Sequence, residues 1–405
     1  MINIAVLGYG TVGSGVVEVI HTNHESIAKK ARQEIVIKYV LDLRDFPGDP
    51  IQEKIVHDFN IILKDEEIKI VVEVMGGVEP AYTFVKSALE HGKSVVTSNK
   101  ELVAKHGSEL IALAKEKNLN FLFEASVGGG IPIIRPLNQS LTADEICEIT
   151  GILNGTTNYI LTKMRVEGSD FDEVLKEAQA LGYAERNPAA DIEGYDTCRK
   201  IAILSSLAFG SQVDYEDVYT EGITNITAKD ILFADHCGYS IKLFGSSKKV
   251  DGKIYIMVAP AMITEENPLY SVNGVYNGIF VKGNVLGDIM FYGSGAGKLP
   301  TASAVVSDVV DEVKHIGTNI LTTWSSKKLE LANIKDSKKQ FFVRIKGNRS
   351  ERTAEIEQMF GTVNIIELVE VKGEFAFITE ELSEAEYTEK AEQIYGILNR
   401  IRVYH

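Results

Sequence analysis

Cysteine, clustered histidine and long apolar runs are all scarce in this chain. The three cysteines, Cys147, Cys198 and Cys237, are scattered and form no CxxC motif, which argues against a disulfide framework and a structural zinc site. The eight histidines show no ligand spacing, so no catalytic divalent metal is expected. No apolar run approaches the ~18–20 residues that span a bilayer, so we expect no membrane-spanning segment.

Positive charge is also in short supply. The 42 Lys and Arg residues are outnumbered by 57 Asp and Glu residues, giving a net charge of −15. This argues against nucleic acid or an anionic membrane as the main partner. The opening MINIAVLGYG has no basic leader and is not expected to be a signal peptide. With 45% apolar and 24% charged residues among 405, we expect a soluble, cytoplasmic protein of two or three domains.

Residues 1–136 alternate strand-like and helix-like stretches. The expected strands are nearly continuous apolar runs, at 2–10, 34–42, 68–77, 93–100 and 119–127. The expected helices between them cover 11–31, 79–91 and 100–117. Such apolar runs suit parallel strands covered on both faces. The alternation predicts an α/β fold with a Rossmann-type doubly wound parallel sheet, forming a dinucleotide-binding domain.

Residues 137–298 change character. Strand-like pieces at 145–155, 253–263 and 278–293 alternate with helices at about 170–181 and 195–209. We expect a mixed α/β domain that supplies catalysis and dimerisation. A helix over about 299–320 is expected to complete the first domain, and the polar stretch 325–340 has the composition of a linker.

Residues 338–405 form a compact pattern of strand, helix, two strands, helix and strand. This βαββαβ order resembles an ACT domain, a small module that often binds amino acids in regulated metabolic enzymes. A generic ferredoxin-like appendage used for dimerisation would show the same order, and topology alone does not separate the two. If the module is regulatory, a stop near Ser337 is expected to leave a folded, active enzyme.

A glycine-rich turn follows the first expected strand. In VLGYGTVGSGV, glycines 8, 10 and 13 have the GxGxxG spacing between a strand and a helix. Such a turn lets the backbone approach a pyrophosphate, which then lies at the positive end of the helix. The residues predicted to bind a dinucleotide are Gly8, Gly10, Thr11, Val12 and Gly13.

The choice between NAD and NADP stays open. Asp42, at the end of the second expected strand, can accept a hydrogen bond from a ribose 2′-hydroxyl, and Arg44 can pair with a 2′-phosphate. The first helical region is long, so Asp42 lies later than the usual offset of about 20 residues.

Carboxylates crowd the stretch LGYAERNPAADIEGYDTCRK, residues 181–200. Gly182, Pro188 and Gly194 predict a loop, after which a helix places Asp196 and Lys200 four residues apart on one face. Such a pair is often only a surface ion pair. In a dinucleotide-binding chain, however, a lysine with an adjusted pKa can move the proton of an alcohol, and carboxylates can bind an ammonium group.

This stretch resembles the signature of homoserine dehydrogenases. The matching positions are Ala178, Gly182, Tyr183, Asn187–Pro188, Asp191–Ile192, Gly194, Asp196 and Lys200. GYGTVGSGV near the start, SNKE at 98–101 and YGSGAGKLPTASAV at 292–305 also resemble that family. The resemblance covers about residues 1–320, and the ACT-like tail is similar to that of the longer monofunctional members.

The resemblance implies NAD(P)H-dependent, reversible reduction of L-aspartate 4-semialdehyde to L-homoserine, a step of threonine, methionine and isoleucine biosynthesis. It implies that Lys200 is the general acid and base and that Lys100 lies beside the nicotinamide and the substrate. Glu185 and Asp196 would bind the amino acid, and Asp191 would support them. Further implied site residues are Gly182 and Gly297 beside the cofactor, and Glu124 with the carbonyls of Val127, Gly129 and Ile131 around a monovalent cation such as sodium.

The resemblance also implies a homodimer or homotetramer and an amino-acid effector such as threonine. Two other functions compete with this one. An aspartate-semialdehyde dehydrogenase needs a nucleophilic cysteine, but Cys198 lies two residues from both Asp196 and Lys200 and would point elsewhere on a helix. A catalytically silent sensor of cofactor and amino acid would not need the intact set of lysines and carboxylates.

Overall fold

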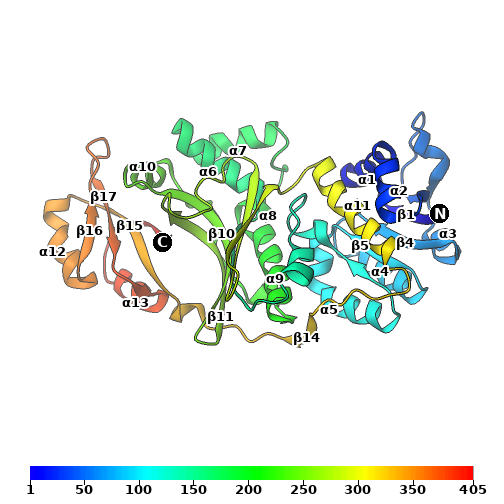
Figure 1. Cartoon of the computed structure of the whole chain (residues 1–405). Helices are drawn as coiled ribbons and strands as arrows, with labels where there is room; N and C mark the ends of the chain where they lie inside the picture. The colour runs from blue at the N-terminus through cyan, green and yellow to red at the C-terminus, as the bar shows by residue number, and fades with distance from the viewer. Residues whose placement is uncertain (405) are drawn as a thin grey trace.

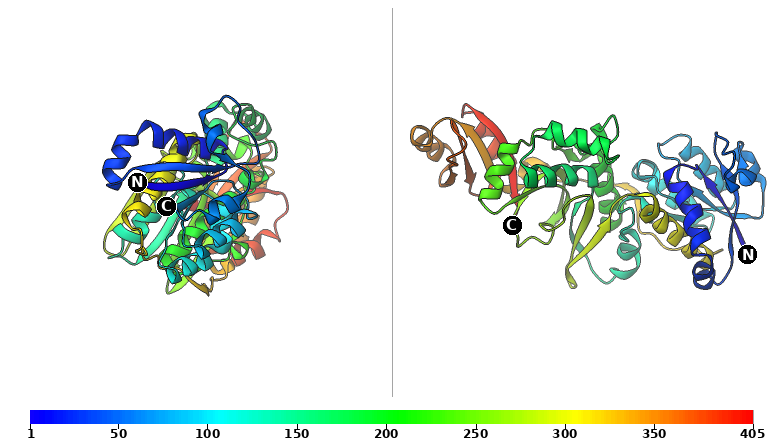
Figure 2. Two further views of the ribbon diagram at one scale, coloured as in Figure 1. Left: turned by 90° about the vertical axis from the view of Figure 1, so that its right-hand side faces the viewer. Right: turned by 90° about the horizontal axis from the view of Figure 1, so that it is seen from above.

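The chain folds around two large sheets in an elongated molecule (Figures 1 and 2). The computed structural model describes residues 1–404, so His405, the last residue of the expected tail, lies outside the described residues. The first sheet lies at one end, the second begins in the middle, and the C-terminal part extends it to the other end (Figure 1). Among residues 1–404, no helix has both the length and the apolar character needed to cross a membrane.

The first sheet is six-stranded and parallel, in the order β3-β2-β1-β4-β5-β6. Its strands are β1 Ile2–Leu7, β2 Ile35–Leu41, β3 Ile55–Val56, β4 Ile68–Glu73, β5 Ser94–Thr97 and β6 Phe121–Leu122. At its centre, Val6 is paired with Val40 on one side and Val72 on the other. This order confirms the predicted doubly wound sheet, to which the short strand β3 adds an edge that the sequence did not indicate.

Helices cover both faces of this sheet. They are α1 Thr11–Thr22, α2 His24–Ala31, α3 Phe59–Lys64, α4 Ala81–Glu90, α5 Lys100–Glu116 and, from much later in the chain, α11 Lys298–Lys314. The helical stretch expected over 11–31 consists of two helices, which Asn23 separates. The later helix, expected to reach about residue 320, ends at Lys314 and packs against α1.

The second sheet has eleven strands, with the main order β13-β12-β7-β10-β11-β19-β15-β17-β16. Its central strands are β7 Ile146–Ile152, β10 Ser240–Val250, β11 Lys253–Ile263, β12 Tyr276–Gly283 and β13 Gly287–Ser294, and β9 Tyr219–Thr220 pairs with β11. The helices of this part are α6 Gly155–Glu167, α7 Phe171–Ala180, α8 Ala189–Ile192, α9 Tyr195–Phe209 and α10 Ala228–His236. Helices α8 and α9 lie on the side of this sheet that faces the first sheet (Figure 1).

The C-terminal part has the predicted βαββαβ order. Its elements are β15 Lys338–Lys346, α12 Arg349–Phe360, β16 Val363–Ile366, β17 Glu374–Thr379, β18 Leu382–Ser383, α13 Glu384–Ala391 and β19 Ile397–Tyr404. Strand β19 pairs with β11 in parallel, from Ala261–Arg402 to Ile263–Tyr404, so the tail continues the central sheet. The expected linker is partly ordered, because its strand β14 Ser325–Lys328 pairs with β8 Ser211–Gln212.

Candidate active site

The start of α9 places a carboxylate and a lysine in the interior. Gly194 caps this helix with a left-handed φ of 85°, a conformation that glycine adopts without strain. Asp196 follows in the first turn and Lys200 one turn later, with exposed fractions of 2% and 7%. They are therefore not the surface ion pair that the spacing alone allows.

Asp196 contacts two lysines from different parts of the fold. Its Oδ2 lies 2.8 Å from Lys200 Nζ, and its Oδ1 pairs with Nζ of Lys100. Lys100 is the first residue of α5 and follows Asn99, whose side chain accepts a hydrogen bond from the backbone of Leu102 and caps the helix. Strand β5 ends just before this cap, so Lys100 lies at the carboxyl edge of the first sheet, where α/β folds bind ligands.

The two lysines have opposite pKa shifts. Burial lowers the pKa of Lys200, although the Asp196 carboxylate opposes that shift. Burial also disfavours the charge on Lys100, but Asp196 and its neighbours outweigh this effect and raise the pKa of Lys100. Burial alone would raise the pKa of Asp196, yet the two lysines reverse it and the pKa is lowered. The site therefore contains one lysine that loses its proton more readily and one that keeps its charge.

An asparagine that the sequence did not single out joins the carboxylates. Asn154 donates through Nδ2 to Asp191 at 2.7 Å and to Asp196 at 2.9 Å. Its Oδ1 accepts from the backbone N–H of Thr157 and caps α6. The neighbouring carbonyl of Leu153 accepts a hydrogen bond from Lys200 Nζ at 2.7 Å. Burial raises the pKa of Asp191. The stretch ILNGTT held a signal for Asn154, since asparagine before a helix is a common cap.

The other predicted residues of this loop lie further out. Glu185 is exposed, and its backbone carbonyl accepts a hydrogen bond from Gln179. Gly182 lies on the exposed turn after α7, with a φ of 76°. The structure thus brings Lys100, Asp191, Asp196 and Lys200 together, whereas Glu185 and Gly182 lie on the surface.

The GxGxxG turn has the geometry of a dinucleotide loop. A Cβ on Gly13 would collide with the carbonyl of Gly8, so α1 packs directly on the turn. A Cβ on Gly10 would meet no atom within 4 Å and would occupy open space beside Thr11 and Val12 at the start of α1. Open space above a glycine at a helix N-terminus fits the approach of a pyrophosphate.

Gly297 reaches the same region from the other end of the chain. It caps α11 with a φ of 121°. Helix α11 lies against α1, where a Cβ on Gly15 would be 2.8 Å from the carbonyl oxygen of Lys298. The N-termini of α1 and α11 therefore lie close together, which fits the expected contact of both with one cofactor.

Asp42 and Arg44, the two residues that could distinguish NAD from NADP, form a hydrogen-bonded ion pair with each other. Both Nε and Nη2 of Arg44 donate to the Asp42 carboxylate at 3.0 Å, and the backbone N–H of Tyr9 donates to it at 2.8 Å. The Arg44 guanidinium holds the pKa of Asp42 below its usual range. A carboxylate and an exposed cation thus meet at one point beside the glycine turn.

Hydrogen bonds within the segment 124–135 hold the loop that is predicted to bind a cation. The carboxylate of Glu124 is buried and accepts from the backbone N–H groups of Ile133, Ile134 and Arg135 at 2.6–2.8 Å. The Glu124 carboxylate thus already accepts three backbone hydrogen bonds, and the cation site that it would form with the carbonyls of Val127, Gly129 and Ile131 stays a prediction. Within residues 1–404, no group of three or more His, Cys, Asp or Glu side chains is placed to hold a metal.

Two family profiles match the parts of the chain that build this site. The profile described as homoserine dehydrogenase matches residues 132–310, and that described as homoserine dehydrogenase, NAD binding domain, matches residues 8–124. A homoserine dehydrogenase of Synechocystis is 48% identical over 318 residues, which cover 77% of this chain and 73% of that protein. The chain belongs to the homoserine dehydrogenase family.

Solved homoserine dehydrogenase structures have the same architecture. That of Thiobacillus denitrificans superposes with a TM-score of 0.90 at 37% identity and covers 100% of this chain and 98% of its own. A hyperthermophilic archaeal homoserine dehydrogenase mutant in complex with NADPH superposes with a TM-score of 0.64 at 31% identity, over 77% of this chain and 97% of its own. The predicted family, activity, α/β fold and NAD(P) cofactor are thereby confirmed. The chain is an NAD(P)-dependent oxidoreductase that acts on the alcohol of homoserine.

Proposed function

We propose that Lys200 exchanges the proton of the substrate oxygen and that Lys100 supplies a fixed positive charge beside it. The opposite pKa shifts of the two lysines support this division, because groups whose pKa values are driven apart suit different roles in one reaction. The nicotinamide, when bound, exchanges the hydride. As hydride leaves homoserine, Lys200 takes the hydroxyl proton, and in the reverse direction Lys200 returns it to the aldehyde oxygen.

The carboxylates supply substrate binding in this proposal. Asp196 lies between the two lysines and fixes their Nζ atoms, while Asn154 fixes Asp196 and Asp191. Asp191 supports Asp196, and Glu185 reaches the substrate ammonium from its exposed loop. Charge-assisted hydrogen bonds to an ammonium are among the stronger polar contacts available to a protein. The single observation that carries the proposal is the contact of the buried Asp196 with both the partly exposed Lys100 and the buried Lys200.

The thioester chemistry of the rival dehydrogenase is not favoured. Cys198 is buried, its thiol donates to the carbonyl of Tyr215, and burial raises its pKa. A catalytic cysteine needs an accessible thiolate.

Substitution of Lys200 tests the proton-transfer role. Lys200→Met should lower kcat by about 10²–10⁴-fold, the usual contribution of a positioned acid or base, while the Kd of the cofactor stays unchanged. Lys200→Arg should not restore turnover, because a guanidinium hardly deprotonates. Near-native kcat in the arginine variant would show that Lys200 supplies only charge, and the proton would then have to be assigned to Lys100.

We also propose a homodimer or homotetramer that forms through the central sheet. Helix α9 covers one face of β10, at Gly245. The neighbouring residues Phe244 and Ser246 point to the opposite face and line a hollow of about 880 Å³, whose other lining residues are mostly polar or charged, such as Glu148, Lys248 and Lys282. Such a face suits a second copy of this chain. Light scattering of the purified enzyme tests this, and a monomeric mass at assay concentration would contradict it.

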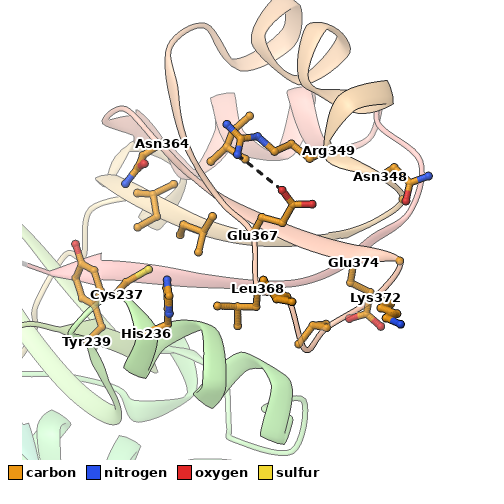
Figure 3. Close-up of a pocket in the computed structure, with 17 residues that line it drawn as sticks. His236, Cys237, Tyr239, Asn348, Arg349, Asn364, Glu367, Leu368, Lys372 and Glu374 are labelled. Atoms are coloured by element: carbon orange, nitrogen blue, oxygen red, sulfur yellow. Dashed lines mark ion pairs between the residues drawn. The ribbon is translucent and has the colours of Figure 1, made fainter.

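For the tail we propose an amino-acid effector site in a hollow of about 1110 Å³ beside the end of α10 (Figure 3). Asn348, Arg349, Glu367 and Lys372 line this hollow, and Arg349 forms an ion pair with Glu367 at 3.8 Å that an amino acid would replace with contacts to its own carboxylate and ammonium. Steady-state rates with and without threonine test the proposal, and loss of inhibition in Arg349→Gln would support this hollow as the effector site.

We place the enzyme in the cytoplasm, in keeping with three free cysteines.

A further inference from the structure

We infer that Glu221 is a positioning residue for the substrate loop and that the C-terminal strand β19 holds it in place. The inference rests on the proposed roles of Asp191 and Asp196, and it makes the tail part of the construction of the active site. The argument follows a continuous set of contacts from β19, through the segment 219–223, to α8 and the start of α9.

The segment 219–223 packs against the backbone of the substrate loop. The N–H of Ile223 donates to the carbonyl of Ile192 at 2.8 Å. A Cβ on Gly222 would collide with the same carbonyl and with the backbone of Glu193, so the two backbones touch directly. Ile192 is the next residue after Asp191, and the glycine that caps α9 follows Glu193. Any movement of 219–223 therefore displaces the loop that carries Asp191 and leads into Asp196.

The side chain of Glu221 is held by two arginines of β19. Its Oε2 accepts from Arg402 Nη1 at 2.8 Å and lies 3.4 Å from Arg400 Nη2. Tyr219 also donates to this oxygen, at 3.0 Å. Arg402 is 1% exposed and makes a second, bidentate contact with Glu384 at the start of α13. A buried bidentate arginine has a fixed position, so Glu221 is tied to a rigid part of the tail.

A shared strand explains why these groups meet. Strand β9 pairs with β11 at Met257–Val258, and β19 pairs with the same strand at Ala261–Ile263. The N–H of Glu221 also donates to the carbonyl of Val258 at 2.8 Å. Strand β19 and the segment 219–223 therefore both lie along β11. This brings Arg400 and Arg402 of β19 next to the carboxylate of Glu221.

A second ion-pair group joins the tail to the body elsewhere and provides a matched control. Lys229 on α10 pairs with Glu374 on β17 at 2.5 Å, and Arg344 on β15 pairs with Asp230 at 2.7 Å. Within the described residues, Lys229 forms no hydrogen bond or ion pair with the segment 219–223; its ammonium contacts Glu374. A variant that only loosens tail docking can thus be compared with one that releases Glu221.

The test uses Glu221→Gln and Arg400→Gln in the full-length enzyme, with Lys229→Gln as the control. For both test variants we expect kcat/KM for homoserine to fall about 5- to 100-fold through a higher KM, because small displacements far from the reacting atoms can cost this much. The Kd of NADP, measured by titration, should stay at the wild-type value, and Lys229→Gln should keep wild-type kinetics. A wild-type KM in Glu221→Gln, or an equal loss in Lys229→Gln, would overturn the inference.

A double-mutant cycle with Asp191→Asn separates this inference from the proposed function. If Glu221 acts through the loop of Asp191, the combined loss in kcat/KM should be smaller than the product of the two single losses. Independent losses would overturn the positioning role alone. A wild-type KM in Asp191→Asn by itself would instead contradict the proposed substrate role of Asp191, whatever Glu221→Gln shows.

Discussion

At the scale of single residues, the site depends on one carboxylate that serves two lysines. Asp196 is almost fully buried, and its two oxygens face different partners, Lys100 and Lys200. A buried carboxylate between two cations remains ionised, and this fixes the charge balance of the site before substrate arrives. Asn154 then fixes the orientation of Asp196 relative to Asp191.

Asn154→Asp should separate the two functions of Asn154. Aspartate still caps α6, so the melting temperature should change little. It loses the two donated hydrogen bonds and brings a third carboxylate beside Asp191 and Asp196, where like charges repel. We expect kcat/KM to fall at least about tenfold, as hydrogen bonds to charged groups contribute about 1.5–3 kcal/mol each. Steady-state kinetics and a thermal melt check this prediction. If activity falls only in proportion to the fraction of unfolded protein, Asn154 has only the capping role.

Residue types and spacing predicted that Asp196 and Lys200 share one helix face, and the family resemblance added Lys100, but neither indicated that the three side chains would be in contact. The i, i+4 spacing of Asp196 and Lys200 placed them on one helix face. Burial of that face, and the contact with Lys100 from 96 positions earlier, depend on tertiary packing. The sequence did not single out Asn154, because β7 ends only two residues before it. The apolar pattern of that strand therefore extends to the residue that caps α6.

At the scale of elements, the cofactor region is built from the ends of two helices. Helix α1 starts at the glycine turn, and α11 starts beside it at Gly297. Helix N-termini attract anions through their unpaired N–H groups and their dipole. Two such ends beside one loop, with Arg44 bonded to the carbonyl of Tyr9 in the same turn, would attract the phosphates of the cofactor.

Gly10→Val should block that site and leave the apoprotein stable. The added side chain enters space that no protein atom occupies, so the melting temperature should shift little while the Kd of NADP rises beyond the measurable range. Gly13→Ala provides the contrast, since its methyl group would strike Gly8 and should lower both binding and stability. Normal cofactor titration in Gly10→Val would remove the turn from the site.

Helix α11 also carries a buried carboxyl group, Glu312, that makes stability depend on pH. Its Oε2 accepts from Asn120 at 3.2 Å, and burial raises its pKa to about 8. The folded state therefore holds a proton that the unfolded state loses above its ordinary pKa near 4.5. This contribution to stability is present at acid pH and is lost as pH rises toward 8.

Glu312→Gln should reduce the loss of stability that accompanies rising pH. A glutamine has no proton to lose, so relative to wild type the free energy of unfolding should rise with pH between about 4.5 and 8, by at most about 1.4 kcal/mol per pH unit. Denaturant titrations at several pH values check this. Glu18→Gln, on the surface where α1 meets α11 through Lys298, is the control and should keep the wild-type slope.

At the scale of the whole molecule, the tail is joined to the body as a continuation of its sheet. Phe342, Ile401 and Val403 belong to the same apolar cluster as the centre of the catalytic part. Strand β19 fills the edge of β11, and Arg402 neutralises Glu221. The sequence showed the order of the tail's elements but not this junction, because strand pairing between distant segments leaves no local pattern.

A stop near Ser337 is therefore expected to destabilise the catalytic part, contrary to the expectation from the sequence. Truncation would expose the edge of β11 to solvent and would remove the arginines that pair with Asp230 and Glu221. We expect the truncated protein to aggregate or to melt well below the full chain. A soluble truncation product with wild-type activity would show that the junction is dispensable.

The late position of α11 in the chain has a consequence for synthesis on the ribosome. On one face of the first sheet, Ile4 and Val6 belong to the same apolar cluster as Ala302, Val305 and Val309, which emerge almost three hundred residues later. At about 5–20 residues per second, the part of this cluster that α11 covers stays exposed for roughly 15–60 s, while α1 and α2 cover the rest. The nascent N-terminal part must meanwhile be shielded from aggregation. Residues 1–136 produced alone should accordingly need a chaperone, or α11 added as a peptide, to remain in solution.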